Sequence, residues 1–253
     1  MHVKDVLDRL RSAGLTANAK KCAFACSRIK ILGHIVENGR ICPDDDKINV
    51  IQKWKVPKNK SQLRSFLGLT NYLREYISHY ATLAFPLTEL LARNKPDKLK
   101  WGAEEQESFD KLKAALTSKP VLKPADPSKG YKLFCDASRM ALSAILMQSD
   151  DNGNNYVIGY GSRKLLPRET KYPIVELELM ALIYGLTKFN HWTYGARIEA
   201  YTDHRPIQWL NSLAKHSPRL ARWSLMLMDY DVTTTYISGD KQIADALTRI
   251  DMD

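Results

Sequence analysis

The feature that most constrains the fold of this chain is a change in hydrophobic pattern near residue 130. Before it, most segments repeat apolar residues at helical spacing, whereas three strand-like runs follow in quick succession after it. The boundary is marked by Pro120, Pro124, Pro127 and Gly130. The chain is therefore predicted to have a mainly helical first part and a mixed α/β second part.

The second part shows an ordered series of strand and helix patterns. Strands are predicted over 131–136, 141–148, 156–162, 197–202 and 232–237, and helices over 175–189, 206–213, 218–228 and 241–250. The order β-β-β-α-β-α-α-β-α predicts a five-stranded mixed sheet with flanking helices, in a domain of about 120 residues.

The first part is predicted to contain helices over 3–15, 45–54, 86–92 and 104–116. A longer helix, capped by Asn59 or Ser61, is expected to continue to residue 77. Two strands over 28–36 and 40–42 are joined by Asn38-Gly39, which is a strong hairpin signal. We find no internal repeat.

The charge of the chain is concentrated in its first half. The 38 Lys and Arg and 28 Asp and Glu give a net charge of +10; residues 1–130 hold 24 basic and 14 acidic side chains, and residues 131–253 hold 14 of each. A basic bias favours a polyanionic partner, most often nucleic acid. The alternative is a basic surface that only keeps the protein in solution.

The sequence carries no sign of a membrane span or of a targeting segment. Its uncharged runs are shorter than the roughly 20 apolar residues that cross a bilayer, and residues 1–5 begin neither a secretion signal nor a transit peptide. An intracellular protein is expected, in a cytoplasmic particle or in the nucleus.

Four cysteines are spread along the chain at Cys22, Cys26, Cys42 and Cys135. Together with His34, the first three suggest a zinc site, but their spacing is unlike that of compact zinc sites. His34 also falls in an apolar, strand-like stretch where it can simply face a neighbour. Scattered cysteines make a poor disulfide framework, so reduced thiols are expected.

Four carboxylates in the second half are unusual in their placement. Asp136 and Asp203 each follow an apolar strand-like run, whereas Glu178 and Asp245 stand in apolar helical stretches. Like charges brought together in this way repel one another unless divalent cations are bound, and hard oxygen ligands suit Mg²⁺. Taken singly, each residue has an ordinary alternative as a turn cap, an exposed helix residue or a partner of a neighbouring arginine.

The segments around these carboxylates resemble the four motifs of the ribonuclease H domain in the Pol polyproteins of gypsy-type LTR retrotransposons. They read Phe134-Cys135-Asp136-Ala137-Ser138, Glu178-Leu179-Met180-Ala181, Tyr201-Thr202-Asp203-His204-Arg205-Pro206 and Ala244-Asp245-Ala246-Leu247-Thr248-Arg249. The first half resembles the same polyprotein, in Leu63-Arg64-Ser65-Phe66-Leu67-Gly68-Leu69 and in Pro86-Leu87-Thr88.

The resemblance implies a ribonuclease H-like fold preceded by the end of a reverse transcriptase. Residues 1–57 would be the remnant of the palm, 58–100 the helical thumb, 101–130 the connection or linker, and 131–253 the ribonuclease H domain. The upstream palm and fingers and the integrase of the same polyprotein are then expected partners. The polymerase motif, an aromatic residue followed two positions later by paired aspartates, is absent, so no polymerase activity is expected from this chain alone.

The implied activity is hydrolysis of the RNA strand of an RNA–DNA hybrid, leaving a 3′-hydroxyl and a 5′-phosphate. Asp136, Glu178, Asp203 and Asp245 would be both the catalytic residues and the ligands of two Mg²⁺ or Mn²⁺ ions. Glu176 is the competitor of Glu178, but two residues apart on a helix they point to different sides, and Glu178 directly precedes the family's continuation.

The side chains expected to contact nucleic acid are basic or polar ones in the thumb and near the motifs. They are Lys55, Lys58, Lys60, Arg64, Ser138, Arg163, His204 and Arg205. For Arg163, His204 and Arg205 a purely structural role is equally open. The family usually has glycines near positions 141 and 143, where this chain has Ala141 and Ser143 after Arg139, so these side chains either crowd the hybrid or stiffen the strand.

Two other functions compete with the nuclease. The first is a catalytically silent or host-adopted module that binds hybrids without cleaving them. The second is an integrase or transposase of the same fold superfamily, which the fourth carboxylate at Asp245 and the thumb-like segment disfavour.

Overall fold

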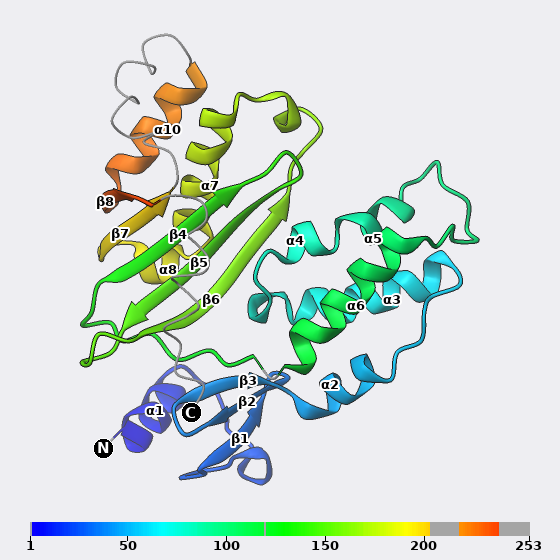
Figure 1. Ribbon diagram of the computed structural model, residues 1–253. Coiled ribbons are helices and arrows are strands. Elements are labelled where there is room, and N and C mark those ends of the chain that lie inside the picture. The colour runs from blue at the N-terminus through cyan, green and yellow to red at the C-terminus, as the bar shows by residue number, and fades with distance from the viewer. Residues whose placement is uncertain (1, 119, 203–217, 238–253) are drawn as a thin grey trace.

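The computed structural model of the protein describes residues 2–118, 120–202 and 218–237, and a five-stranded mixed sheet is its centre (Figure 1). The strands are β4 (Tyr131–Ala137), β5 (Ala141–Ser149), β6 (Asn155–Lys164), β7 (Arg197–Thr202) and β8 (Asp231–Tyr236). They lie in the order β6-β5-β4-β7-β8, with β4, β5 and β6 antiparallel and β4, β7 and β8 parallel. The predicted fold class and all five predicted strands are confirmed.

Alternating side chains give the sheet two buried faces. On one face, Leu133 and Cys135 of β4 belong to a first core with α7 (Ile174–Lys188), α8 (Asn190–Thr193) and α10 (Pro218–Met228). On the other face, Phe134, Ile145 and Met147 belong to a second core. The sheet is therefore the middle of three layers.

The second core is completed by a helical module, residues 60–117, which comes from the first half of the chain. It consists of α3 (Lys60–Tyr72), the 3₁₀ turn η2 (Arg74–Tyr76), α4 (Tyr80–Leu83), α5 (Phe85–Leu90) and α6 (Ala103–Thr117). Phe66, Leu87 and Leu112 are fully buried in this core together with the sheet residue Met147. The helical module and the sheet thus share one hydrophobic core, although their sequence patterns differ.

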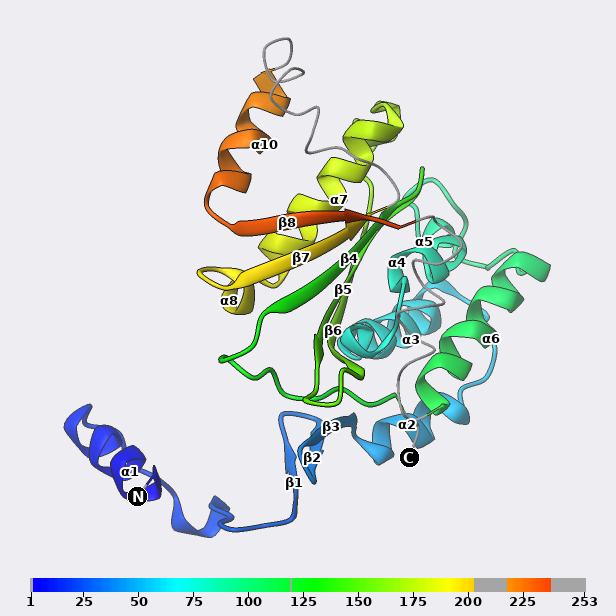
Figure 2. The same cartoon turned by 60° about the vertical axis from the view of Figure 1, so that its left-hand side comes forward.

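The chain before the helical module is the least buried part. It contains α1 (His2–Ser12), the 3₁₀ turn η1 (Ala19–Lys21), a hairpin sheet of β1 (Arg28–Ile31), β2 (His34–Glu37) and β3 (Arg40–Pro43), and α2 (Asp45–Gln52). None of residues 2–34 is buried. Figure 2 shows α1 standing apart from the rest of the molecule. The predicted helix is confirmed, but it packs on nothing within the described part of the chain.

The single strand predicted over 28–36 is wrong. A tight turn at Leu32-Gly33 divides it into β1 and β2, with φ of 46° and 73° at these two residues. Leucine rarely adopts positive φ, so only Gly33 indicated the turn in the sequence. The predicted turn at Asn38-Gly39 is confirmed, with φ of 49° and 69°.

The other differences from the predicted helices are small. The helix capped by Asn59 ends at Tyr72 instead of 77, and the four-residue helices α4 and α8 were not predicted. The predicted helices over 206–213 and 241–250 lie outside the described residues. His34 faces a neighbour, as its Nδ1 lies 2.7 Å from the Tyr76 hydroxyl. Within the described residues, no helix is both long enough and apolar enough to cross a membrane.

Candidate active site

Asp136 lies at the edge of the sheet where β4 and β7 end. These two strands are parallel neighbours at the centre of the sheet, so their carboxyl ends meet at the same edge. The run Leu133, Phe134 and Cys135 is buried, but the Asp136 side chain is 39% exposed. A carboxylate at this position is held by a rigid strand and remains accessible to a ligand from solvent.

Glu178 projects from α7 into the interior beneath this edge. It is only 3% exposed, and it lies between the buried residues Leu177 and Leu179. Burial raises the pKa of the Cys135 thiol, and the charges of Glu178 and then of Asp136 raise it further. Both carboxylates therefore lie close enough to Cys135 to act on it electrostatically, one from the helix and one from the strand.

The structure separates Glu178 from its competitor Glu176. The Glu176 carboxylate accepts a hydrogen bond from the Arg219 guanidinium of α10 and forms an ion pair with it. Glu178 faces the sheet instead, because residues two apart on a helix point to different sides. The expected preference for Glu178 agrees with this arrangement, since Glu176 is engaged with Arg219 of α10.

The remaining carboxylates and two of the basic candidates cannot be placed. Asp203, His204, Arg205 and Asp245 lie outside the described residues. Asp203 follows Thr202, the last residue of β7, directly in the sequence. Within residues 2–118, 120–202 and 218–237 there is no cluster of three or more His, Cys, Asp or Glu that would hold a metal ion.

The donor set that is described fits a hard divalent cation. Asp136 and Glu178 offer carboxylate oxygens, which suit Mg²⁺ or Mn²⁺ better than softer metals. Glu178 is only 3% exposed, and burial of an ionised carboxylate is costly unless it is paired or coordinates a metal. The thiol of Cys135 is held protonated by its surroundings, which makes it a poor ligand.

His79 of the helical module lies beside Asp136 and is not among the residues predicted from the sequence. Its Nδ1 lies 3.8 Å from Asp136 Oδ2, and its side chain is 22% exposed. Burial lowers the pKa of His79, and the nearby Asp136 charge offsets part of this effect. No local sequence signal connects the two residues, because the contact depends on the helical module packing against the sheet.

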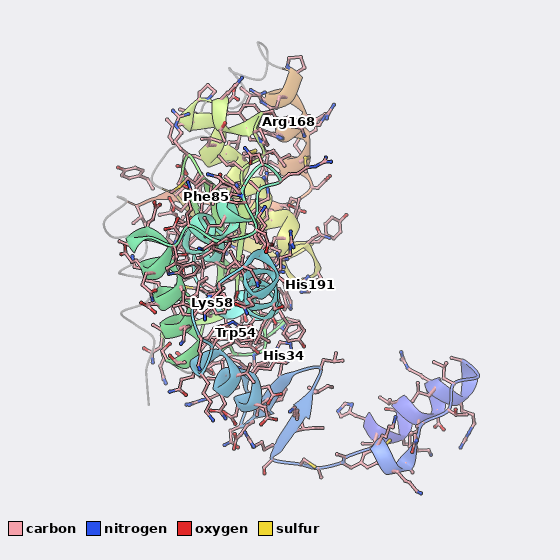
Figure 3. All side chains as sticks on the ribbon, turned by 90° about the vertical axis from the view of Figure 1, so that its right-hand side faces the viewer. His34, Trp54, Lys58, Phe85, Arg168 and His191 are labelled. Carbon is pink, nitrogen blue, oxygen red and sulfur yellow. The ribbon has the colours of Figure 1, made fainter. Side chains whose placement is uncertain are left out.

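The basic residues of the first half that are predicted to contact nucleic acid differ in their exposure to solvent. Lys55, Lys58 and Arg64 are exposed, and Figure 3 labels Lys58 at the helical module. Lys60 is only 7% exposed, and its ammonium donates hydrogen bonds to the carbonyls of Ala92 and Lys95, each at 2.7 Å. The prediction that Lys60 contacts nucleic acid is therefore wrong. Its ammonium group holds the loop between α5 and α6 and is not available to a ligand.

Two candidates of the second half are engaged in local structure. The Ser138 hydroxyl accepts hydrogen bonds from the amides of Met140 and Ala141 in the β4–β5 turn, at 3.2 and 3.0 Å. Arg163 forms a two-pronged ion pair with Glu169, at 2.7 and 3.2 Å. Arg163 therefore has a structural role in this pair with Glu169.

The residues that depart from the usual glycine pattern do not project into solvent. Ala141 and Ser143 are 2% and 4% exposed, and they lie on the sheet face that carries the second core. Arg139 donates from Nη1 to the Tyr172 carbonyl at 3.0 Å and so holds the loop before α7. The described geometry agrees better with stiffening of β5 than with crowding of a ligand.

Comparisons with known proteins agree with this architecture. Residues 126–230 match the family model described as the RNase H-like domain found in reverse transcriptase. The Transposon Tf2-3 and Tf2-4 polyproteins of Schizosaccharomyces pombe are each 37% identical over 255 residues, covering 98% of this chain. The chain spans 19% of the length of these relatives.

Solved structures share the fold across nearly the whole chain. The foamy viral protease-reverse transcriptase in complex with RNA/DNA hybrid has a TM-score of 0.74 at 22% identity, over 94% of this chain and 33% of that chain. The same protein in complex with dsDNA has a TM-score of 0.73 at 22% identity, over 94% of this chain and 50% of that chain. Residues 126–230 therefore carry the RNase H-like domain found in reverse transcriptase, and the transposon relatives support its assignment to the RNase H region of an LTR retrotransposon Pol polyprotein.

Proposed function

We propose that this chain is a divalent-metal-dependent endonuclease that hydrolyses the RNA strand of RNA–DNA hybrids. The observation that carries the proposal is that the charges of Glu178 and of Asp136 both act on Cys135 near the end of β4, within a domain of the RNase H-like family. Domains of this family are generally nucleases that use divalent ions. The specific reaction, the ions and the residues are the proposal.

In this proposal Asp136, Glu178, Asp203 and Asp245 bind two Mg²⁺ or Mn²⁺ ions. When bound, such a pair of ions activates a water and stabilises the leaving oxygen at phosphorus. Asp136, on the rigid end of β4, orients one edge of the site, and Glu178 presents its carboxylate from a buried position that excludes bulk water. Both contributions come from the packing of α7 on β4.

The hybrid is proposed to lie along the exposed basic residues as well as at the carboxylates. Lys55, Lys58 and Arg64 are exposed and carry part of the charge surplus of the first half. One foamy viral relative of the fold is solved with RNA/DNA hybrid, which supports this choice of ligand. Contacts to phosphates make the affinity fall with salt and carry no sequence preference by themselves.

The division of the chain also remains a proposal. Residues 1–57 are taken as the end of a palm, 58–100 as the thumb, 101–130 as the connection and 131–253 as the ribonuclease H domain. No residue of 2–34 is fully buried, which supports a surface that an upstream palm and fingers would cover. The integrase of the polyprotein is a further proposed partner, and DNA synthesis is not proposed for this chain.

The test compares two glutamates of α7 in the full chain. Glu178→Gln is expected to abolish Mg²⁺-dependent cleavage of a labelled hybrid, whereas Glu176→Gln, which only weakens the pair with Arg219, is expected to leave cleavage close to that of the wild type. A duplex of RNA and a duplex of DNA serve as substrates that should not be cut. Equal cleavage by the two variants would refute the proposed site.

The same assay decides between the nuclease and the silent hybrid-binding module. Tight binding of the hybrid without cleavage at any Mg²⁺ or Mn²⁺ concentration would favour the binding module. The burial of Ala141 and Ser143 and the local role of Arg139 argue against it, because these residues do not obstruct the exposed Asp136.

A further inference from the structure

The turn between η2 and α4 of the helical module lies on the sheet beside the candidate site. The Ala81 amide donates a 2.9 Å hydrogen bond to the hydroxyl of Ser162 in β6. Ser162 is paired across the sheet with Ser143, and Ser143 is paired with Asp136. Directly paired residues share a face, so this turn is fixed at one end of a row that leads to Asp136.

His79 occupies this turn in the left-handed backbone region, with φ of 52° and ψ of 31°. Residues other than glycine adopt this region infrequently, although asparagine, aspartate and histidine do so more often than the rest. The His79 carbonyl begins α4 by accepting from the amides of Thr82 and Leu83. The imidazole makes no capping hydrogen bond, so α4 does not need this side chain.

The contacts of the imidazole point to Asp136. Nδ1 lies 3.8 Å from Asp136 Oδ2, and Nε2 is buried without a hydrogen-bond partner among the described residues. A separation of 3.8 Å is longer than a hydrogen bond but within electrostatic reach of a carboxylate oxygen. The ring thus limits the space and the orientation available to the Asp136 carboxylate.

We propose that His79 is a positioning residue which the helical module contributes to the nuclease site. In this role the imidazole holds the Asp136 carboxylate in the orientation that binds a divalent cation, as outer partners of metal-binding carboxylates do. The site is then composite, because His79 lies outside the segment 126–230 that matches the RNase H-like family. This inference rests on the proposed metal-binding role of Asp136.

The experiment uses the full chain with His79→Asn. Asparagine accepts the left-handed conformation, so the substitution removes the ring while keeping the turn. The Mg²⁺ concentration that gives half-maximal cleavage is expected to rise about 10-fold or more, the range measured for outer partners of metal ligands. Without substrate, the rise in melting temperature caused by Mn²⁺ is expected to shrink.

Two controls separate positioning from simple structural damage. Glu89→Gln weakens the ion pair with Lys164 between the same helical module and β6, and it is expected to leave the Mn²⁺ response unchanged. In an Asp136→Asn background, His79→Asn should have no further effect on that response. If His79→Asn does not fold, His79→Gly supplies the same test, because glycine also accepts the left-handed turn.

The outcomes distinguish this inference from the proposed function. A weaker metal response in His79→Asn, with that of Glu89→Gln unchanged, supports the positioning role. Equal metal responses in His79→Asn and the wild type overturn it, even if Asp136→Asn abolishes cleavage. Full cleavage by Asp136→Asn overturns the proposed function itself, together with the inference that depends on it.

Discussion

Replacing Gly185 with alanine tests how closely α7 must lie on the sheet. A Cβ added at Gly185 would stand 3.1 Å from Leu133 Cδ1 and from Ala144 Cβ, and 3.2 Å from Cys135 Sγ. Carbon atoms in good contact are about 3.5–4.0 Å apart. Alanine therefore requires α7 or the facing side chains of the sheet to give way by a few tenths of an ångström.

Two energies of opposite sign decide the stability of this variant. Alanine favours a helix over glycine by about 0.8–1 kcal/mol, and overpacking of a core costs about 1–3 kcal/mol. Gly68→Ala is the matched control, because Gly68 is exposed in the middle of α3 and its added Cβ meets nothing within 4 Å. The difference in unfolding free energy between the two variants, about 1–3 kcal/mol, measures the crowding alone.

The same displacement affects the candidate site. α7 carries Glu178, so moving the helix outward separates Glu178 from Asp136, and a shift of this size is expected to slow cleavage about tenfold. Urea unfolding gives the free energies, and cleavage of a labelled hybrid gives the rate. If Gly185→Ala is as stable as Gly68→Ala and cleaves at the rate of the wild type, α7 does not need to pack this closely on the sheet.

Two further predictions concern ionisable groups. Burial acts to raise the pKa of Glu169, but hydrogen bonds from Arg163 and from the Leu166 amide outweigh it and lower the pKa below its ordinary value. The pair with Arg163 therefore stabilises the fold above the unfolded pKa, and this contribution is lost as the pH falls through the folded pKa. Between about pH 5 and pH 3 the wild type should lose more unfolding free energy than Glu169→Gln, and equal losses in urea titrations would contradict the assignment. Burial, then Glu178 and Asp136, raise the pKa of Cys135, so a thiol reagent should label the exposed Cys22 and Cys26 in the native protein and reach Cys135 only after unfolding. Labelling of Cys135 at the rate of Cys22 would show that the site is open to solvent.

Local pattern was enough to predict most of the fold. The five strands after residue 130, the helices over 175–189 and 218–228, the hairpin turn at Asn38-Gly39 and the cap at Asn59 each depend on near neighbours in the sequence, and each is confirmed. The turn at Leu32-Gly33 was missed because a leucine with positive φ is imposed by its surroundings, including the Tyr72 hydroxyl that donates to the Leu32 carbonyl.

The candidate site likewise contains residues that local pattern predicts and contacts that it does not. Asp136 and Glu178 were found from their positions in a strand and in an apolar helix, and the structure describes both in the expected elements. The burial of Lys60 and the approach of His79 to Asp136 depend on contacts between distant segments, which no periodicity records. Charge alone therefore predicted a ligand contact for Lys60, which is buried. The contact between His79 and Asp136 joins segments too distant in the sequence for a local pattern to predict.

Cleavage and binding of one labelled RNA–DNA hybrid by the wild type and by Asp136→Asn test the proposed nuclease most directly. We expect the wild type to cut the RNA strand only when Mg²⁺ or Mn²⁺ is present. We expect Asp136→Asn not to cut this strand, although it binds the hybrid with a similar Kd. Metal-dependent cleavage by Asp136→Asn at the rate of the wild type would refute the proposed role of Asp136.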